Sequence, residues 1–70
     1  MVKRKFDTLM ENVKRMETAE LLEKKEDLYN VTFAMTEMQL KEFTDYLVWK
    51  NAAYREEGNV FIYGIYECIF

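Results

Sequence analysis

Apolar residues near the beginning of the chain recur at intervals of three and four positions. The residues with this spacing are Phe6, Leu9, Met10, Val13 and Met16. Such spacing places them on one stripe of an α-helix. The stripe stops where the next positions in register are Glu17 and Glu20, and Thr18 is a suitable N-cap for a second short helix. We therefore expect a helix over residues 6–16, a kink or break near Glu17, and a second helix over residues 18–27.

The periodicity changes to two in residues 28–35. Tyr29, Val31, Phe33 and Met35 alternate there with smaller or more polar side chains. β-branched and aromatic residues are enriched in strands, so this segment predicts a β-strand with one core face.

A strong helix-start signal follows this predicted strand. Thr36 and Gln39 have the spacing of a capping box, in which each side chain bonds the backbone of the other residue. Gly58 is the first glycine downstream, and glycine commonly follows the last residue of a helix. The pattern predicts a helix over residues 37–57.

This predicted helix has two apolar faces at 100° per residue. The first consists of Leu40, Phe43, Leu47 and Tyr54, and the second consists of Met38, Tyr46, Trp49 and Ala53. A surface helix needs only one apolar face. The second is either covered by the N-terminal helices as ordinary core, or it binds a partner or a second copy of the chain. Trp and Tyr are over-represented at binding hot spots, so these four residues are the candidate partner-binding site.

The final segment, residues 60–70, again has period two, and Glu67 is its one charged residue. Strands that are apolar on both faces are typical of sheet interiors. Strand, long helix and strand favour a right-handed parallel crossover, with an antiparallel pair as the alternative. Two strands alone form a marginal sheet. Residues 1–6 can supply a third strand, but we favour completion by a dimer mate or partner.

Composition agrees with one folded domain over residues 1–70. Half of the residues are hydrophobic and 16% are aromatic, so the chain is not expected to be disordered. A single cysteine excludes an internal disulfide, and we expect Cys68 to be an inert core residue. No apolar stretch has the length of a membrane-spanning helix. The expected location is the cytoplasm. The fold class is α+β, with one or two helices followed by strand–helix–strand.

Charge is unevenly distributed along the chain. Residues 1–16 carry five basic and two acidic residues, whereas residues 17–45 carry three basic and eight acidic ones. The basic group is Lys3, Arg4, Lys5, Lys14 and Arg15. The net charge of −3 argues against general phosphate binding. A nucleic-acid accessory role, or imitation of a phosphate backbone by the acids, is an alternative that we do not favour.

Catalytic chemistry is poorly represented. The chain has no histidine, the commonest general base and a common metal ligand. Its two glycines are isolated, so no phosphate-binding loop is present. We expect no enzyme activity, catalytic residue, cofactor or metal.

These observations favour a small, acidic, non-catalytic regulator that binds another protein. Compact chains of this type are frequent among inhibitors encoded by phages and mobile elements, which is an association at the level of a class. Such an inhibitor would occlude a site on a host protein through Met38, Tyr46 and Trp49, or through a free strand edge. A structural homodimer with a shared sheet is the main alternative.

Overall fold

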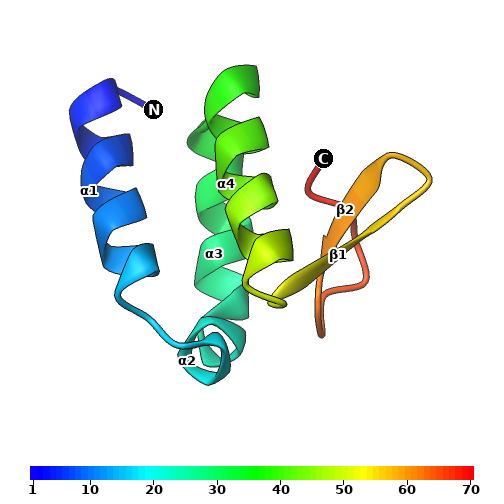
Figure 1. Cartoon of the computed structure of the whole chain (residues 1–70). Coiled ribbons are helices and arrows are strands. Elements are labelled where there is room, and N and C mark those ends of the chain that lie inside the picture. Colours follow the sequence, from blue (N-terminus) through cyan, green and yellow to red (C-terminus); the bar gives the residue numbers. More distant parts are fainter.

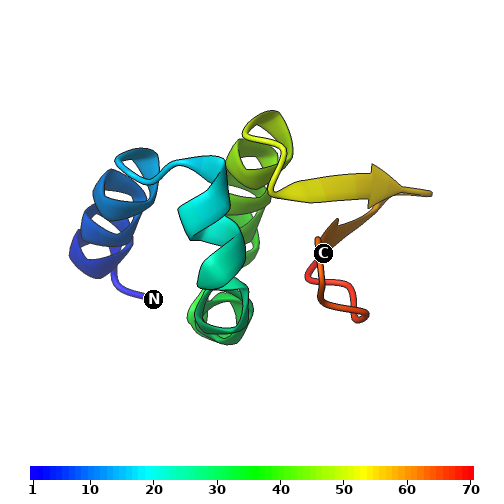
Figure 2. The same ribbon diagram turned by 90° about the horizontal axis from the view of Figure 1, so that it is seen from below.

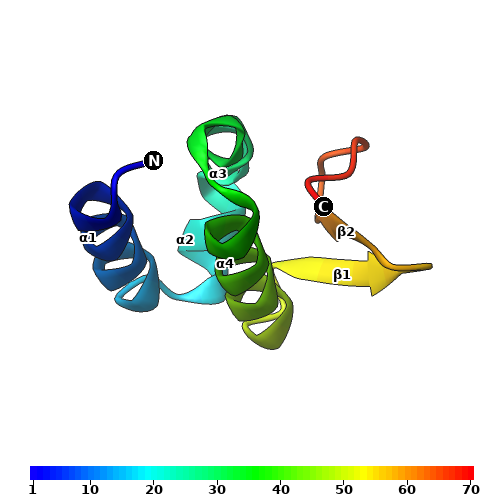
Figure 3. The same cartoon turned by 90° about the horizontal axis from the view of Figure 1, so that it is seen from above.

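The computed structural model covers residues 1–70 and contains four α-helices, one short 3₁₀-helix and a two-stranded antiparallel hairpin (Figure 1). The elements are α1 (Lys3–Lys14), α2 (Thr18–Glu23), α3 (Lys25–Val31), η1 (Thr32–Ala34), α4 (Glu37–Trp49), β1 (Ala53–Glu56) and β2 (Asn59–Ile62). α4 lies between α1 and the hairpin, as the views from below and from above both show (Figure 2, Figure 3). The α+β class is confirmed. The order strand–helix–strand is wrong, because no strand precedes α4.

The predicted apolar stripe of α1 and the break near Glu17 are confirmed, but the second helix, predicted over residues 18–27, ends at Glu23 as α2, and α3 begins at Lys25. The buried residues of α1 are Phe6, Met10 and Val13. α2 begins after the break, but its N-cap residue is Glu17 and not Thr18. The Thr18 hydroxyl instead donates a hydrogen bond of 2.8 Å to the carbonyl oxygen of Lys50. This bond connects the start of α2 to the end of α4.

The start of the chain is helical, so the alternative of a third strand at residues 1–6 is wrong. α1 begins at Lys3. The Met1 ammonium group donates to the Ala34 carbonyl. The side-chain amide of Gln39 donates to the Met1 carbonyl at 2.7 Å. The chain is thus anchored to the junction between η1 and α4 before α1 starts.

The strand predicted at residues 28–35 is also wrong, because α3 and η1 occupy this segment. Its two buried residues are Leu28 and Thr32, which are one helical turn apart. The Thr32 hydroxyl donates to the Tyr29 carbonyl at 2.5 Å, which satisfies a polar group that helical packing buries. Tertiary packing here overrides a local β-propensity that depends strongly on context.

The start of α4 is as predicted. Thr36 is the N-cap, and its hydroxyl accepts from the Gln39 N–H at 3.2 Å. The Gln39 side chain accepts in return from the Thr36 N–H at 3.0 Å. The capping box is therefore confirmed by both of its hydrogen bonds.

The end of α4 lies eight residues before the predicted one. Asn51 has a positive φ of 65°, the left-handed conformation that often follows a helix. The Ala52 N–H bonds the Leu47 carbonyl, and the Asn51 N–H bonds the Val48 carbonyl. This pair of bonds defines a Schellman motif. Leu47 and Ala52 occupy the two positions of the motif that are commonly apolar, and both are fully buried. Asn51 therefore supplies the stop signal that we assigned to Gly58.

Gly58 belongs to the hairpin turn instead. Glu57 and Gly58 join β1 to β2, and both have a positive φ, as a two-residue type I′ turn requires. The register pairs Ala53 with Ile62 and Glu56 with Asn59. The strands are antiparallel, so the parallel crossover is wrong.

The long strand predicted at residues 60–70 is correct only for its first residues. β2 ends at Ile62, and the chain then turns back along the free side of β2. The Ile69 N–H bonds the Val60 carbonyl at 2.8 Å, and Phe61 forms an isolated bridge with Cys68. The last residues therefore cover one edge of the hairpin and leave the outer edge of β1 open.

One core joins the helices to the inner face of the hairpin. Its fully buried side chains include Val13, Leu21, Phe43, Leu47, Val60 and Ile62. The inner face of β2 is thus covered by helices of the same chain, and completion of the sheet by a dimer mate is not confirmed. None of the helices combines the length and the apolar composition that spanning a bilayer requires.

Candidate interaction surfaces

The second apolar face of α4 remains largely in contact with solvent. The exposed fraction is 84% for Met38 and 74% for Trp49, and Tyr46 is half-buried. The rings of Tyr46 and Trp49 lie 5.9 Å apart at a tilt of 43°. The Nζ atom of Lys50 lies 6.0 Å from the centre of the Trp49 ring. The N-terminal helices therefore do not cover Trp49 as core, and we call Met38, Tyr46 and Trp49 the α4 stripe.

Ala53 does not belong to the α4 stripe. It is the first residue of β1, and its side chain is only 3% exposed. Because α4 stops at Trp49, position 53 leaves the helical register that placed it beside Tyr46 and Trp49. Its place on a binding face is contradicted by this burial.

A shallow pocket lies beside Met38, between α1 and α4. Its volume is about 260 Å³, and its lining residues are Lys3, Phe6, Asp7, Met38, Gln39 and Glu42. Lys3 and Asp7 form an exposed ion pair of 3.0 Å at this position. The polar groups around Met38 resemble the polar rim that surrounds the apolar centre of many protein interfaces.

The outer face of the hairpin carries three aromatic side chains that the sequence reading did not place together. Tyr54 stacks on Phe61 with ring centres 5.3 Å apart, and Tyr63 lies 5.1 Å from Tyr54. They share a face because alternate residues of a strand point to the same side. The alternation on both sides of Glu57-Gly58 was a usable hairpin signal, but the predicted helix over residues 37–57 concealed it.

Cys68 also lies on the surface, so its expected role as a core residue is wrong. Its side chain is exposed, opposite Phe61 in the bridge that closes the hairpin edge. The inward-pointing neighbour Ile69, which is 7% exposed, takes the core position instead.

A hydrogen bond connects the C-terminal loop to α3. The Tyr29 hydroxyl donates to the Glu67 carboxylate at 2.6 Å. This bond raises the pKa of Tyr29 above its ordinary value, because it favours the protonated phenol, and partial burial and the negative charge of Glu67 act in the same direction. The two residues line a pocket of about 440 Å³ between α3 and residues 64–67.

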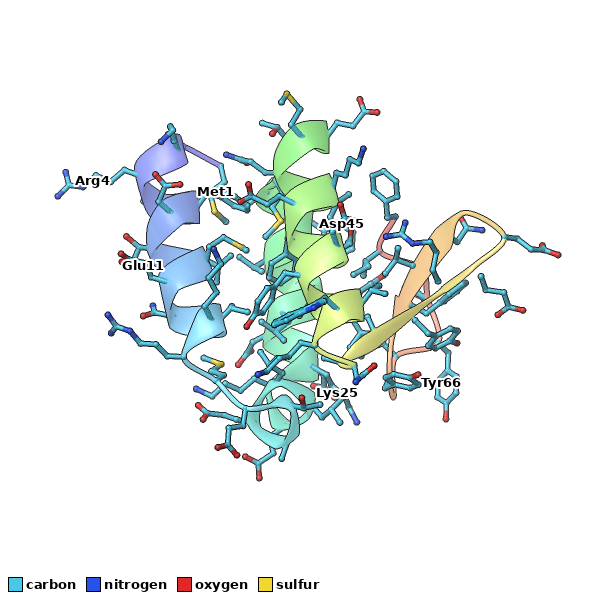
Figure 4. All side chains as sticks on the ribbon, in the orientation of Figure 1. Met1, Arg4, Glu11, Lys25, Asp45 and Tyr66 are labelled. Carbon is cyan, nitrogen blue, oxygen red and sulfur yellow. The ribbon has the colours of Figure 1, made fainter.

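The basic residues near the N-terminus do not form an uninterrupted cationic surface. Lys3 and Arg4 share an open depression on α1 with Asp7 and Glu11. Figure 4 shows the side chains of Arg4 and Glu11 projecting from α1. Mixed charge of this kind does not have the clustered basic character typical of a nucleic-acid footprint. The structure also contains no group of three His, Cys, Asp or Glu side chains arranged to hold a metal ion.

Comparison with known proteins adds no further information on these surfaces. No protein-family model matches the chain, and no curated protein and no solved structure shows a significant match.

Proposed function

We propose that this chain is a non-catalytic protein-binding regulator, and that the α4 stripe is its docking surface. The observation that carries the proposal is the position of Trp49, which is 74% exposed although tryptophan belongs to the aromatic residues that dominate the energetics of cores and interfaces. Covering it would remove about 150 Å² of mainly apolar surface from water, a gross gain of about 4 kcal/mol. A gain of this size is typical of an interface hot spot.

The form of regulation that we propose is occlusion, as in an inhibitor of phage or mobile-element type that covers a site on a host protein. The α4 stripe provides the apolar centre of the contact. The exposed acids of residues 17–45 provide the electrostatic bias, since this segment has eight acidic and three basic residues. The negative electrostatic potential of these acids increases the rate of encounter with a basic target, and salt screens this effect.

A pair of matched variants tests the docking surface. Phe33 and Trp49 are equally exposed, at 74%, but Phe33 lies in η1 and outside the α4 stripe. Proteins from a lysate of the native host should bind wild type and Phe33→Ala but not Trp49→Ala. A protein with this pattern is then purified and its dissociation constant measured for all three chains. Equal binding by Trp49→Ala, with its fold intact, would remove the α4 stripe from consideration.

A second candidate function is a structural homodimer, which the open outer edge of β1 favours. The Tyr63 N–H bonds the Ala52 carbonyl, so the hydrogen-bonded pairs of the register include Tyr54 with Phe61. The N–H of Arg55, between these pairs, therefore points outward and has no strand to bond. An antiparallel β1 from a second copy would extend the sheet.

The homodimer is tested by removing this outward N–H alone. Arg55→Pro deletes it without breaking a bond between β1 and β2, and proline is tolerated on edge strands. Arg55→Ala is the matched control, since both variants lose the 2.7 Å ion pair with Asp45. Sedimentation should show a dimer for wild type and Arg55→Ala and a monomer for Arg55→Pro. A wild-type monomer at high micromolar concentration would eliminate this candidate.

A further inference from the structure

The pocket between α3 and the C-terminal loop combines two acids with two aromatic rings. α3 contributes Glu26 and Tyr29, and the loop contributes Tyr66 and Glu67. Gly64 and Asn30 complete most of the lining. No basic side chain lines the pocket, although α3 begins with Lys25. This lining is chemically suited to a cation.

The carboxylate of Glu67 is held in place but not neutralised. One of its oxygens accepts the 2.6 Å hydrogen bond from Tyr29, and neither Glu67 nor Glu26 takes part in any of the ion pairs of the chain. This hydrogen bond is the main reason why the pKa of Tyr29 is raised, and the negative charge of Glu67 acts in the same direction. A fixed carboxylate with one free oxygen is a preorganised acceptor for a charged donor.

Tyr66 provides an aromatic face beside this acceptor. Its side chain is 96% exposed, the highest value among the large apolar and aromatic residues of the chain, so it contributes little to the core. The loop that carries it is fixed at both ends. The Ile65 N–H bonds the Ile62 carbonyl, and Ile69 is bonded to Val60 and buried. A free tyrosine ring on an ordered loop can stack on a guanidinium group.

Lys25 lies beside Gly64, one of the lining residues, and its positive charge acts against this attraction. A Cβ atom at Gly64 would lie 2.7 Å from the Lys25 Nζ atom, so the lysine side chain runs along the backbone of Gly64. Lys25 nevertheless forms no ion pair with either acid of the pocket. The charge of Lys25 lowers the affinity of the pocket for a second cation. Replacing Lys25 therefore has the opposite expected effect on binding to replacing Glu67.

We propose that this pocket binds an arginine side chain from a basic segment of a partner protein. The planar guanidinium group donates to the free oxygen of Glu67 and stacks on the ring of Tyr66, and this planar stacking is a contact that the compact ammonium group of lysine does not offer. The acidic lining repels a phosphate backbone, so a nucleic acid is not the occupant. The site is separate from the α4 stripe, and the proposal holds whether or not Trp49 binds a partner.

The test uses a capped peptide with three arginines and the same peptide with citrulline, which keeps the shape of arginine and removes its charge. Titration of the ¹⁵N-labelled chain should shift the amide signals of residues 26–30 and 64–67 with the arginine peptide alone. Glu67→Gln keeps an oxygen that accepts from Tyr29 but removes the charge, and it should weaken binding about fivefold. Glu11→Gln changes the net charge equally on α1, far from Tyr66 (Figure 4), and should change binding less than about twofold.

Three further variants separate the contribution of the Tyr66 ring from that of the surrounding charge. Tyr66→Ala should weaken binding about threefold, and Tyr66→Phe should retain it. Lys25→Met should strengthen binding, because it removes the opposing charge. The proposal is overturned by equal losses for Glu67→Gln and Glu11→Gln, by equal shifts with the citrulline peptide, or by an oligothymidylate that shifts the same residues. Trp49→Ala should bind the peptide like wild type, so this result does not depend on the α4 stripe.

Discussion

Leu47 and Trp49 are only two positions apart in α4, yet their removal should affect folding very differently. Leu47 is fully buried, and truncation of a buried leucine to alanine costs about 2–5 kcal/mol through lost contacts and a residual cavity. Leu47 also occupies the apolar position of the Schellman motif, which places the expected loss for Leu47→Ala in the upper half of that range. Trp49→Ala loses mainly the tilted contact with Tyr46, worth about 0.5–1.5 kcal/mol. The better helix propensity of alanine offsets part of this loss.

The difference is large compared with the stability of so small a domain. At about 0.05–0.15 kcal/mol per residue, a chain of 70 residues has a free energy of unfolding of about 4–10 kcal/mol. Leu47→Ala should therefore lower the urea midpoint by about 3.5–5 M, and Trp49→Ala by less than about 1 M, for a slope near 1 kcal/mol per molar urea. Far-UV circular dichroism can follow both transitions, because it reports helix content and does not require the indole ring.

One result would refute the reasoning behind the α4 stripe. If Trp49→Ala lowers the free energy of unfolding by more than about 2 kcal/mol, Trp49 supports the fold as a buried residue does. The burial pattern of α4 would then be incorrect, and any loss of partner binding in that variant would reflect unfolding.

The remaining predictions concern the cap, the turn and the loop contact. Thr36→Ala should lower the free energy of unfolding by about 1 kcal/mol through loss of the capping box, as measured by thermal melting. Glu57→Asn should raise the melting temperature, because asparagine before Gly58 tolerates the positive φ of a type I′ turn better than glutamate. Glu67→Gln should lower the pKa of Tyr29, followed by tyrosinate absorbance, because it removes the negative charge that opposes ionisation. The Tyr29 contact should stabilise the fold fully below the ordinary tyrosine pKa of about 10 and lose its effect as the pH rises through the higher folded value.

The sequence predicted the elements whose signals are local. The stripe of α1 and the capping box of α4 each depend on residues within a few turns of one another, and both were found. The segment around Leu28 and Thr32 was ambiguous because it satisfies two periods at once. Alternation over four positions resembles a strand, while the spacing of Leu28 and Thr32 is one helical turn. Only the packing of Leu28 into the core decides between them.

The predicted end of α4 was wrong for a different reason. Asn51 is a less common stop residue than glycine, and Gly58 downstream offered a stronger signal for the wrong position. Because the helix was predicted to continue to residue 57, Ala53 was assigned to it and not to β1. For the same reason the aromatic outer face of the hairpin was not predicted. No local sequence pattern could predict the pocket between α3 and the C-terminal loop, since its central contact joins Tyr29 to Glu67, a residue 38 positions later.

The exposure of the one indole in the chain has a practical consequence. Tryptophan emission depends on contact with water, so a partner that covers Trp49 would shift the spectrum of the unlabelled protein. Filling of the α3 pocket, which contains no tryptophan, would leave that spectrum unchanged. Intrinsic fluorescence measured at a single excitation wavelength can thus report which of the two surfaces a given ligand occupies, with no dye attached and no residue replaced.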